Sequence, residues 1–277
     1  MLVKEFFAFI KERWSIYQAR QLGQPRPWTK DPILQKFRFC NVHRECDSVT
    51  CWIADNWRGS HAKDADLWFA MVVARLFNQP NTLKIIGWPV PFKPARIQNA
   101  VQKMQLEGLR VFNAAYIVST NGLAMDKCEY VVQRVLVPLW ADRKVLRPRT
   151  DDTLRTFGAR LQQYQGLGGF LAGQVTSDVK FVEPLKGATD WWMYATSGPG
   201  SRRGLNRVLE RPVDAPWREE EWLAQLNLLQ TKIDPLARAA GIPRISASDL
   251  QNCCCEADKW WRARLGQGRP KQLYGGV

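Results

Sequence analysis

The chain has 277 residues, of which 40 are Lys or Arg and 26 are Asp or Glu, giving a formal net charge of +14. With 45% hydrophobic and 11% aromatic residues it is not intrinsically disordered, and it is long enough to bury a core without disulfides or metals. Its longest apolar stretch, residues 67–77, contains Arg75 and is too short to cross a bilayer. Charged residues also interrupt the N-terminal apolar stretch, as no signal peptide would allow. We therefore expect a soluble cytoplasmic protein with no membrane partner, and seven cysteines in reduced form.

Hydrophobic periodicity predicts a mainly α fold. The first helix, residues 2–22, ends at a stretch rich in Gly and Pro, and Asp31 and Pro32 are typical of the start of a second helix that runs to Phe39. Residues 109–119 fit either a strand or a buried loop. Further helices are predicted over 64–78, 94–107, 126–140, 151–164, 170–182 and 214–239, and from a Ser246 or Ser248 cap to Arg264. Residues 200–211 and the tail from 266 are predicted as loops.

No internal repeat and no long flexible linker divides the sequence. We therefore expect a single helical domain over residues 1–277. The alternative is two helical lobes, about 1–140 and 141–277, on either side of a DNA-binding cleft.

The positive charge is concentrated in three segments, the last of which also contains two tryptophans. They are residues 143–149, 202–211 and 259–271, the last of which ends in the candidate DNA-binding residues Arg269 and Lys271. Basic segments of this kind favour a polyanionic partner, and some of the 13 tryptophans can stack on an unpaired base. Solvated charged faces are the alternative for each segment taken singly.

A Gly-rich segment between two predicted helices is the most informative motif. From Leu161 to Val175 the residues follow the pattern of a helix-hairpin-helix motif, with Gly166, Gly168 and Gly169 in the turn. Glycine allows the tight turn, and the backbone N–H groups of the turn and of the next helix can then bind a DNA phosphate. The alternative is an ordinary turn between two packed helices.

A second Gly-rich segment carries Gly198 and Gly200 followed by Arg202 and Arg203. Glycines allow a close approach of the backbone to a ligand, and adjacent arginines can bind phosphate or pyrophosphate oxygens. A surface loop with incidental charge is the alternative.

Two aspartates, Asp178 and Asp190, lie near these motifs and are candidate general bases. A lone aspartate is otherwise a helix cap or an ion-pair partner.

Polar residues also gather in two further segments. In the first they are Arg38, Asn41, Arg44 and Asp47, for which a buried network linking Arg44 and Asp47 is the alternative. In the last predicted helix Glu256 and Lys259 share a face and can be catalytic or merely form a salt bridge. The cysteines and His43 of residues 40–51 match no standard zinc spacing, so we expect no metal site.

The sequence contains no Gly-Lys dipeptide and therefore no P-loop of the GxxxxGK[ST] type, which disfavours a nucleotide-dependent kinase. It contains only two histidines, which disfavours His-based catalytic triads and multi-histidine metal sites.

Taken in order along the chain, these motifs resemble a phage enzyme family. The pattern comprises Arg20-x-x-Gly23-x-Pro25-x-Pro27-Trp28-Thr29-x-Asp31-Pro32, Asn41-x-x-Arg44-x-x-Asp47, the Gly-rich hairpin with Asp178, Gly198-Pro199-Gly200-x-x-Arg203-Gly204, and Cys255-Glu256-x-Asp258-Lys259 with Gly268-Arg269-Pro270-Lys271. It is similar to the alpha-glutamyl/putrescinyl thymine pyrophosphorylases, also called amino acid:DNA transferases, and to the helical domain attached to 5-hydroxymethyluracil DNA kinases. The resemblance extends from about residue 14 to residue 274.

The resemblance implies a helix-hairpin-helix fold like that of DNA glycosylases and a role in thymine hypermodification. In that scheme 5-hydroxymethyluracil in double-stranded phage DNA is phosphorylated and then pyrophosphorylated, and an amino acid or polyamine displaces the pyrophosphate. A 5-hydroxymethyluracil DNA kinase is then the neighbour in the pathway. The usual catalytic aspartate of the glycosylase superfamily would fall at Ala188, so Asp178 and Asp190 both stay open as the base.

The chemistry that the resemblance implies suggests the following roles for several of the candidate residues. Trp28 or Trp192 holds a flipped base, and Arg38 or Arg44 binds the carboxylate of an amino acid donor. Arg202, Arg203 and Lys259 neutralise pyrophosphate. No cofactor is required by the sequence, and assistance by Mg²⁺ stays open. The alternatives are a DNA glycosylase and a non-catalytic DNA-binding module that partners a kinase.

Overall fold

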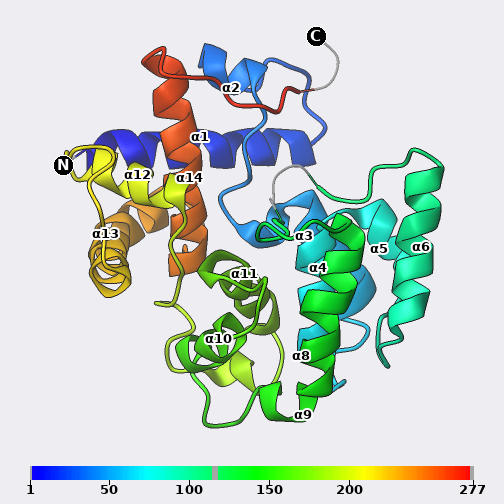
Figure 1. Ribbon diagram of the computed structural model, residues 1–277. Coiled ribbons are helices and arrows are strands. Elements are labelled where there is room, and N and C mark those ends of the chain that lie inside the picture. Colours follow the sequence, from blue (N-terminus) through cyan, green and yellow to red (C-terminus); the bar gives the residue numbers. More distant parts are fainter. Residues whose placement is uncertain (1, 114–117, 275–277) are drawn as a thin grey trace. The chain divides into compact units, whose positions relative to one another are not determined.

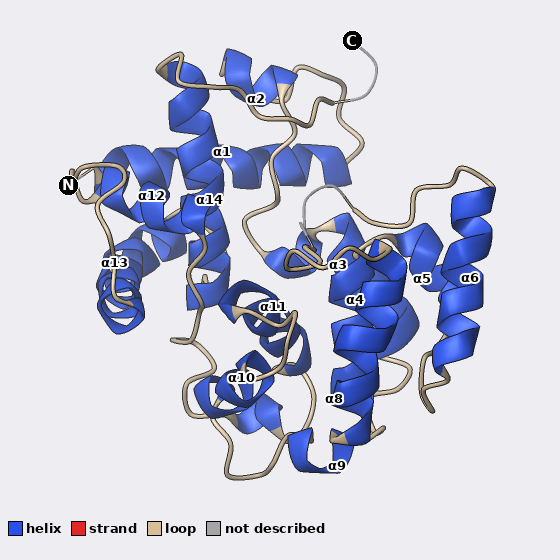
Figure 2. Ribbon diagram, viewed as in Figure 1, coloured by secondary structure: helices blue, strands red, loops and turns tan. Residues whose placement is uncertain are grey.

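The computed structural model describes residues 2–113 and 118–274, and these residues confirm the mainly α prediction (Figures 1 and 2). In these ranges no strand forms, and extended pairing is confined to an isolated antiparallel bridge between Phe37 and Leu273. Residues 114–117 of the segment predicted as strand or loop lie outside the described residues. No helix in the described ranges is long and apolar enough to span a membrane.

The chain divides into two compact units. Unit 1 comprises Met1–Asp47 and Trp192–Val277, whereas unit 2 is the continuous segment Ser48–Trp191. Unit 1 is therefore discontinuous in sequence. Residues 140 and 141, near which we placed the division between two lobes, both lie inside unit 2.

Unit 1 is built on α1, whose apolar residues recur every three or four positions and form its core-facing side. Phe6, Phe9, Ile10 and Ile16 are buried there, and Phe6 stacks on Trp261 of the last helix. The helices of this unit are α1 (Val3–Gln21), α2 (Pro32–Lys36), α12 (Pro199–Val208), α13 (Glu219–Ala239) and α14 (Ala247–Arg264), with a 3₁₀ turn at Arg44–Cys46.

The predicted loop at residues 200–211 is wrong, since Pro199–Val208 is helix α12. Glycines cost helix stability, but here they allow α12 to approach α14 closely. A Cβ on Gly204 would lie 1.9 Å from the carbonyl oxygen of Cys254, and one on Gly200 would lie 2.5 Å from the Cys255 Sγ. Spaced four residues apart, the two glycines occupy one face of the helix, and that face packs on α14.

Unit 2 surrounds α4, in which every residue from Leu67 to Phe77 is buried. A helix that is hydrophobic all round belongs in the centre of a helical unit. The helices are α3 (Ser48–Ile53), α4 (Leu67–Phe77), α5 (Pro80–Ile86), α6 (Pro94–Leu106), α7 (Lys127–Glu129), α8 (Val137–Ala141), α9 (Arg143–Leu146), α10 (Leu154–Gln162) and α11 (Gly169–Val179). π-Helical segments at Ala54–Arg58 and Tyr130–Leu136 and a 3₁₀ turn at Leu185–Gly187 complete the unit.

Most predicted helices are present, and the differences lie at their ends. α2 stops at Lys36 instead of Phe39 because Phe37 is extended and pairs with the tail at Leu273. α10 begins after Thr153, whose hydroxyl accepts the N–H of Thr156, so the helix starts at Leu154 and not at residue 151.

Candidate functional site

Two segments far apart in the sequence, residues 40–47 and α14, meet in unit 1. Together with Arg13 of α1 they form what we call the α14 polar cluster: Arg13, Asn41, Asp47, Glu256 and Lys259. Glu256 is only 2% exposed and joins the two segments. One carboxylate oxygen lies 2.5 Å from the Lys259 Nζ, and the other accepts the backbone N–H of Cys40 at 3.2 Å. Four of the residues that sequence motifs singled out thus converge, although 216 positions separate Cys40 from Glu256.

Sequence reasoning missed Arg13, which fixes the Cys40–Asn41 segment. Its side chain is buried on the core face of α1 and donates to the backbone oxygens of Cys40 at 3.1 Å and Asn41 at 2.8 Å. The available signal was its spacing, because Arg13 follows Phe6, Phe9 and Ile10 on the same helical face. A charged residue on an apolar stripe needs buried partners, and these carbonyl groups supply them.

Asp47 is the titratable group of the cluster. Burial raises the pKa of Asp47 to about 6, against the opposing effect of the Asn41 backbone N–H, which donates to Asp47 Oδ1 at 2.8 Å. The side-chain amide of Asn41 donates in turn to the backbone oxygen of Cys46 at 2.6 Å. A carboxyl group with this pKa can accept and release a proton near neutral pH, as general base catalysis requires.

Lys259 stays cationic in this cluster. Burial lowers its pKa, but the Glu256 carboxylate outweighs this effect and holds the pKa of Lys259 above its ordinary value. Its side chain is 36% exposed. A permanent positive charge beside solvent suits anion binding rather than proton transfer.

The other candidates of the N-terminal segment differ in burial. Arg44 is buried, and its backbone N–H donates to Asp249 at 2.9 Å, so the segment is tied to α14 a second time. Arg38 is exposed, with its backbone N–H bonded to Gln272. Trp28 lines a cavity of about 330 Å³ and carries the Arg26 guanidinium 4.8 Å above its ring.

The two aspartates predicted as general bases both lie in unit 2 with structural partners. Asp178 is fully buried and receives two hydrogen bonds from the Arg75 guanidinium, at 2.6 and 2.5 Å. Asp190 accepts the backbone N–H groups of Leu154 and Arg155 at 2.8 and 3.0 Å, which satisfies the start of α10.

The Gly-rich hairpin of unit 2 borders a cavity of about 550 Å³. Gly166 has φ +83°, and a Cβ there would lie 2.6 Å from Val135, so only glycine fits the turn. By contrast, a Cβ on Gly168 would meet nothing within 4 Å. Gly169 is the first residue of α11, so the helix begins in the wall of the cavity with its first N–H groups lacking intrahelical partners.

The remaining candidates are spread over unit 1. Arg202 is engaged by Glu219 at 2.9 Å and by the hydroxyl of Ser197 at 2.7 Å. Arg203 contacts Asp258. Trp192 is 38% exposed. Gly198 is the buried N-cap residue of α12, and both Arg269 and Lys271 are exposed.

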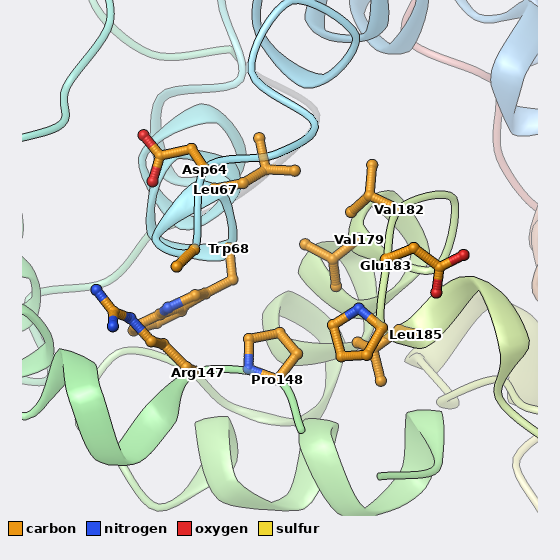
Figure 3. A pocket seen from close by; sticks show the side chains of 11 residues that line it. Asp64, Leu67, Trp68, Arg147, Pro148, Val179, Val182, Glu183 and Leu185 are labelled. Carbon is orange, nitrogen blue, oxygen red and sulfur yellow. The ribbon is translucent and has the colours of Figure 1, made fainter. Parts of the chain in front are cut away.

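A smaller cavity of about 150 Å³ lies in unit 2 between α4 and the chain that follows α11 (Figure 3). Leu67, Trp68, Val179 and Val182 give it mainly apolar walls. Its size is below that of most ligand pockets. Over all of the described ranges, no group of three or more His, Cys, Asp or Glu side chains is arranged to hold a metal ion.

Residues 1–269 match the protein family described as "5-hmdU DNA kinase, helical domain". The chain is also 25% identical over 227 residues to the "5-hmdU DNA kinase" of Bacillus phage SP10. That alignment covers 74% of this chain but 36% of the relative, so the chain corresponds to about a third of the phage protein. No solved structure matches.

Proposed function

Because the chain belongs to the family of 5-hmdU DNA kinase helical domains, we propose that it is a transferase of phage thymine hypermodification. Its substrate is pyrophosphorylated 5-hydroxymethyluracil in double-stranded DNA, and its second substrate is an amino acid or a polyamine. The observation that carries the proposal is the α14 polar cluster, in which the Asp47 carboxyl group, with a pKa of about 6, and the cationic Lys259 both interact with Glu256. Amine transfer needs both a group that accepts a proton and a cationic group that binds the pyrophosphate anion.

The reaction is a substitution at the methylene carbon of the base. The neutral amine nitrogen forms a bond to that carbon while the bond from carbon to the pyrophosphate oxygen breaks, and pyrophosphate leaves with the electron pair. The proton lost by the ammonium group passes to Asp47, which now replaces Asp178 and Asp190 as the proposed base because its pKa of about 6 suits proton transfer near neutral pH. Lys259 neutralises charge on the leaving group, and Glu256 positions Lys259.

DNA binding is assigned to the Gly-rich hairpin. The α10–turn–α11 arrangement supports the helix-hairpin-helix assignment, and the open backbone at Gly168 and Gly169 suits a DNA phosphate. A base must leave the stack before its methylene carbon can be reached, so we propose base flipping on a fold like that of the DNA glycosylases. Trp28, with Arg26 above its ring, is the proposed platform for the flipped base.

The test is a digest of reacted DNA. The protein is incubated, with and without Mg²⁺, with DNA that carries pyrophosphorylated 5-hydroxymethyluracil and with a mixture of amino acids and polyamines. Nucleoside mass spectrometry is expected to show thymidine plus one amine, and Asp47→Asn is expected to lose this product while Asp190→Asn keeps it. Free base and abasic sites would instead identify a glycosylase, and unchanged nucleosides would contradict catalysis by this chain.

A second candidate is a non-catalytic DNA-binding module that presents DNA to a kinase. It is favoured by the alignment itself, which matches this chain to a third of a phage protein named as a kinase. The module predicts DNA binding with steep salt dependence and no turnover.

A further inference from the structure

Three arginines surround one fully buried carboxylate in unit 1, an arrangement we call the Asp258 cluster. Arg203 Nε lies 3.0 Å from Asp258 Oδ2, Arg207 Nε lies 3.1 Å from Oδ1, and Arg262 Nε lies 3.3 Å from Oδ2. Three guanidinium groups against one carboxylate leave a surplus of two positive charges at a single point. An excess of this kind is costly unless a further anion balances it.

The donors of the cluster are only partly used. Arg207 is 8% exposed, and its Nη2 donates to Gln267 at 2.8 Å, so it is fixed within the protein. Arg203 and Arg262 are 31% and 34% exposed, and each meets Asp258 through Nε. In the described part of the chain, their four terminal Nη groups have no hydrogen-bond partner.

The close approach of α12 and α14 makes the cluster rigid. Gly204 lies directly against the Cys254 carbonyl, and it is flanked by Arg203, while Arg207 comes one turn later on the same helix. Figure 1 shows α12 lying against α14, which supplies Asp258 and Arg262. Because Arg203 and Arg262 both contact the Oδ2 atom of Asp258, their guanidinium groups are neighbours.

We propose that the Nη groups of Arg203 and Arg262 bind phosphoryl oxygens and that Asp258 positions both arginines. Guanidinium groups prefer planar, bidentate contacts with such oxygens. Two neighbouring guanidinium groups can therefore bind two phosphoryl groups that follow one another in the ligand. The ligand chemistry has two sources, free pyrophosphate and consecutive phosphates of the DNA backbone. The pyrophosphate source rests on the proposed function, since pyrophosphate is the product released there.

The proposal extends the sequence interpretation and also corrects it. Of the two adjacent arginines expected to bind pyrophosphate, Arg202 is engaged by Glu219 and Ser197, which leaves Arg203. Its partner in the site is Arg262, which lies 59 positions later in the numbering and was not a candidate.

The experiment compares two double variants of the full chain. Arg203→Gln with Arg262→Gln removes the two partly exposed guanidinium groups and leaves Arg207 beside Asp258. The control, Arg218→Gln with Arg238→Gln, removes the same charge from exposed positions of unit 1. Calorimetric titration with sodium pyrophosphate and DNA-binding titrations over a range of salt concentrations are carried out below the unfolding midpoint of every variant, with folding checked by circular dichroism.

If free pyrophosphate is the ligand, its affinity is expected to fall at least tenfold in the first variant and less than twofold in the control, with the salt slope of DNA binding equal in the two variants. If backbone phosphates are the ligand, the salt slope of DNA binding is expected to fall by about two in the first variant relative to the control. Equal pyrophosphate affinity and equal salt slopes in the two variants would overturn the proposal. Neither titration needs turnover, so a chain that binds phosphoryl groups but transfers no amine would contradict only the proposed function.

Discussion

Two buried carboxylates, Asp178 in unit 2 and Asp258 in unit 1, are both fully inaccessible and both paired with arginine, yet the arginines around them differ in their exposure to solvent. The Asp178 carboxylate is paired with the Arg75 guanidinium, itself 2% exposed, and Arg58 donates to the backbone oxygen of Asp178 at 3.5 Å, so the partners of this acid lie inside the core. Asp258 meets three guanidinium groups, two of which reach the surface. A matched ion pair stabilises or specifies a fold, whereas surplus charge held rigidly at the surface suits a ligand. Burial of an acid therefore does not by itself distinguish structure from function.

The sharpest way to break this comparison is Asp178→Asn. The substitution leaves Arg75 charged and without a matching carboxylate in the core, so the free energy of unfolding is expected to fall by about 3–5 kcal/mol. Urea denaturation followed by circular dichroism measures it. The control, Asp190→Asn, changes only a helix-end contact and is expected to cost about 1 kcal/mol. An Asp178→Asn protein with wild-type stability and no turnover would instead make Asp178 a catalytic residue.

Gly204→Ala tests whether helix contact holds the Asp258 cluster together. A methyl group 1.9 Å from the Cys254 carbonyl oxygen forces α12 away from α14, and a cost of about 1–3 kcal/mol in unfolding free energy is expected. Gly187→Ala is the control, since nothing lies within 4 Å of the new Cβ there. Pyrophosphate affinity is expected to fall with Gly204→Ala and not with the control. Unchanged thermal unfolding of Gly204→Ala would mean that the two helices need not be so close.

Asp47 differs from both Asp178 and Asp258, because burial raises its pKa and thereby stabilises its protonated form. Because its pKa rises from 3.8 to about 6 on folding, the folded protein binds the proton more tightly, and stability falls as pH rises from about 4 to about 6. Asp47→Asn removes this decrease of stability with pH, because asparagine does not titrate. Its unfolding midpoint is expected to equal that of the wild type below pH 4 and to exceed it by a few degrees above pH 6. If the unfolding midpoints of the wild type and of Asp47→Asn changed with pH in parallel across this range, the raised pKa of Asp47 would be contradicted.

The smallest expected effect on stability belongs to Gly168→Ala in the hairpin of unit 2. Its Cβ would enter open space, so the unfolding midpoint is expected to stay unchanged while DNA affinity falls several-fold through crowding of a phosphate. Gly166→Ala, with φ +83° and Val135 at 2.6 Å, is expected to destabilise the unit instead. Fluorescence anisotropy with labelled DNA and thermal unfolding separate the two. Wild-type DNA affinity in Gly168→Ala would remove the hairpin from the interface.

The sequence was sufficient to predict most of the helices, because periodicity and caps are local signals. The Ser246 cap is an example: its hydroxyl lies 2.6 Å from Asp249 Oδ2, within the four-residue pattern of a capping box. α12 was missed because its glycines suggested a loop, and only the position of Cys254 explains why a helix needs them there.

The candidate site was predictable in its residue types but not in its pairings. Asn41, Asp47, Glu256 and Lys259 carried recognisable polar patterns, and the structure brings them together. The role of Asp178 could not be predicted from its neighbours in the sequence, because its partner Arg75 lies 103 positions earlier, in a helix whose other residues are apolar. Ion pairs of this kind depend on helix packing, which leaves no regular spacing in the sequence.

The discontinuity of unit 1 has a consequence for biosynthesis. α1 leaves the ribosome well before α13 and α14, the helices that pack against it. Unit 2 is continuous and can complete its core while the apolar side of α1, with Phe6 and Ile10, still lacks these partners. A nascent chain halted before α13 therefore exposes the apolar side of α1 to solvent, and we expect it to bind chaperones at this stage.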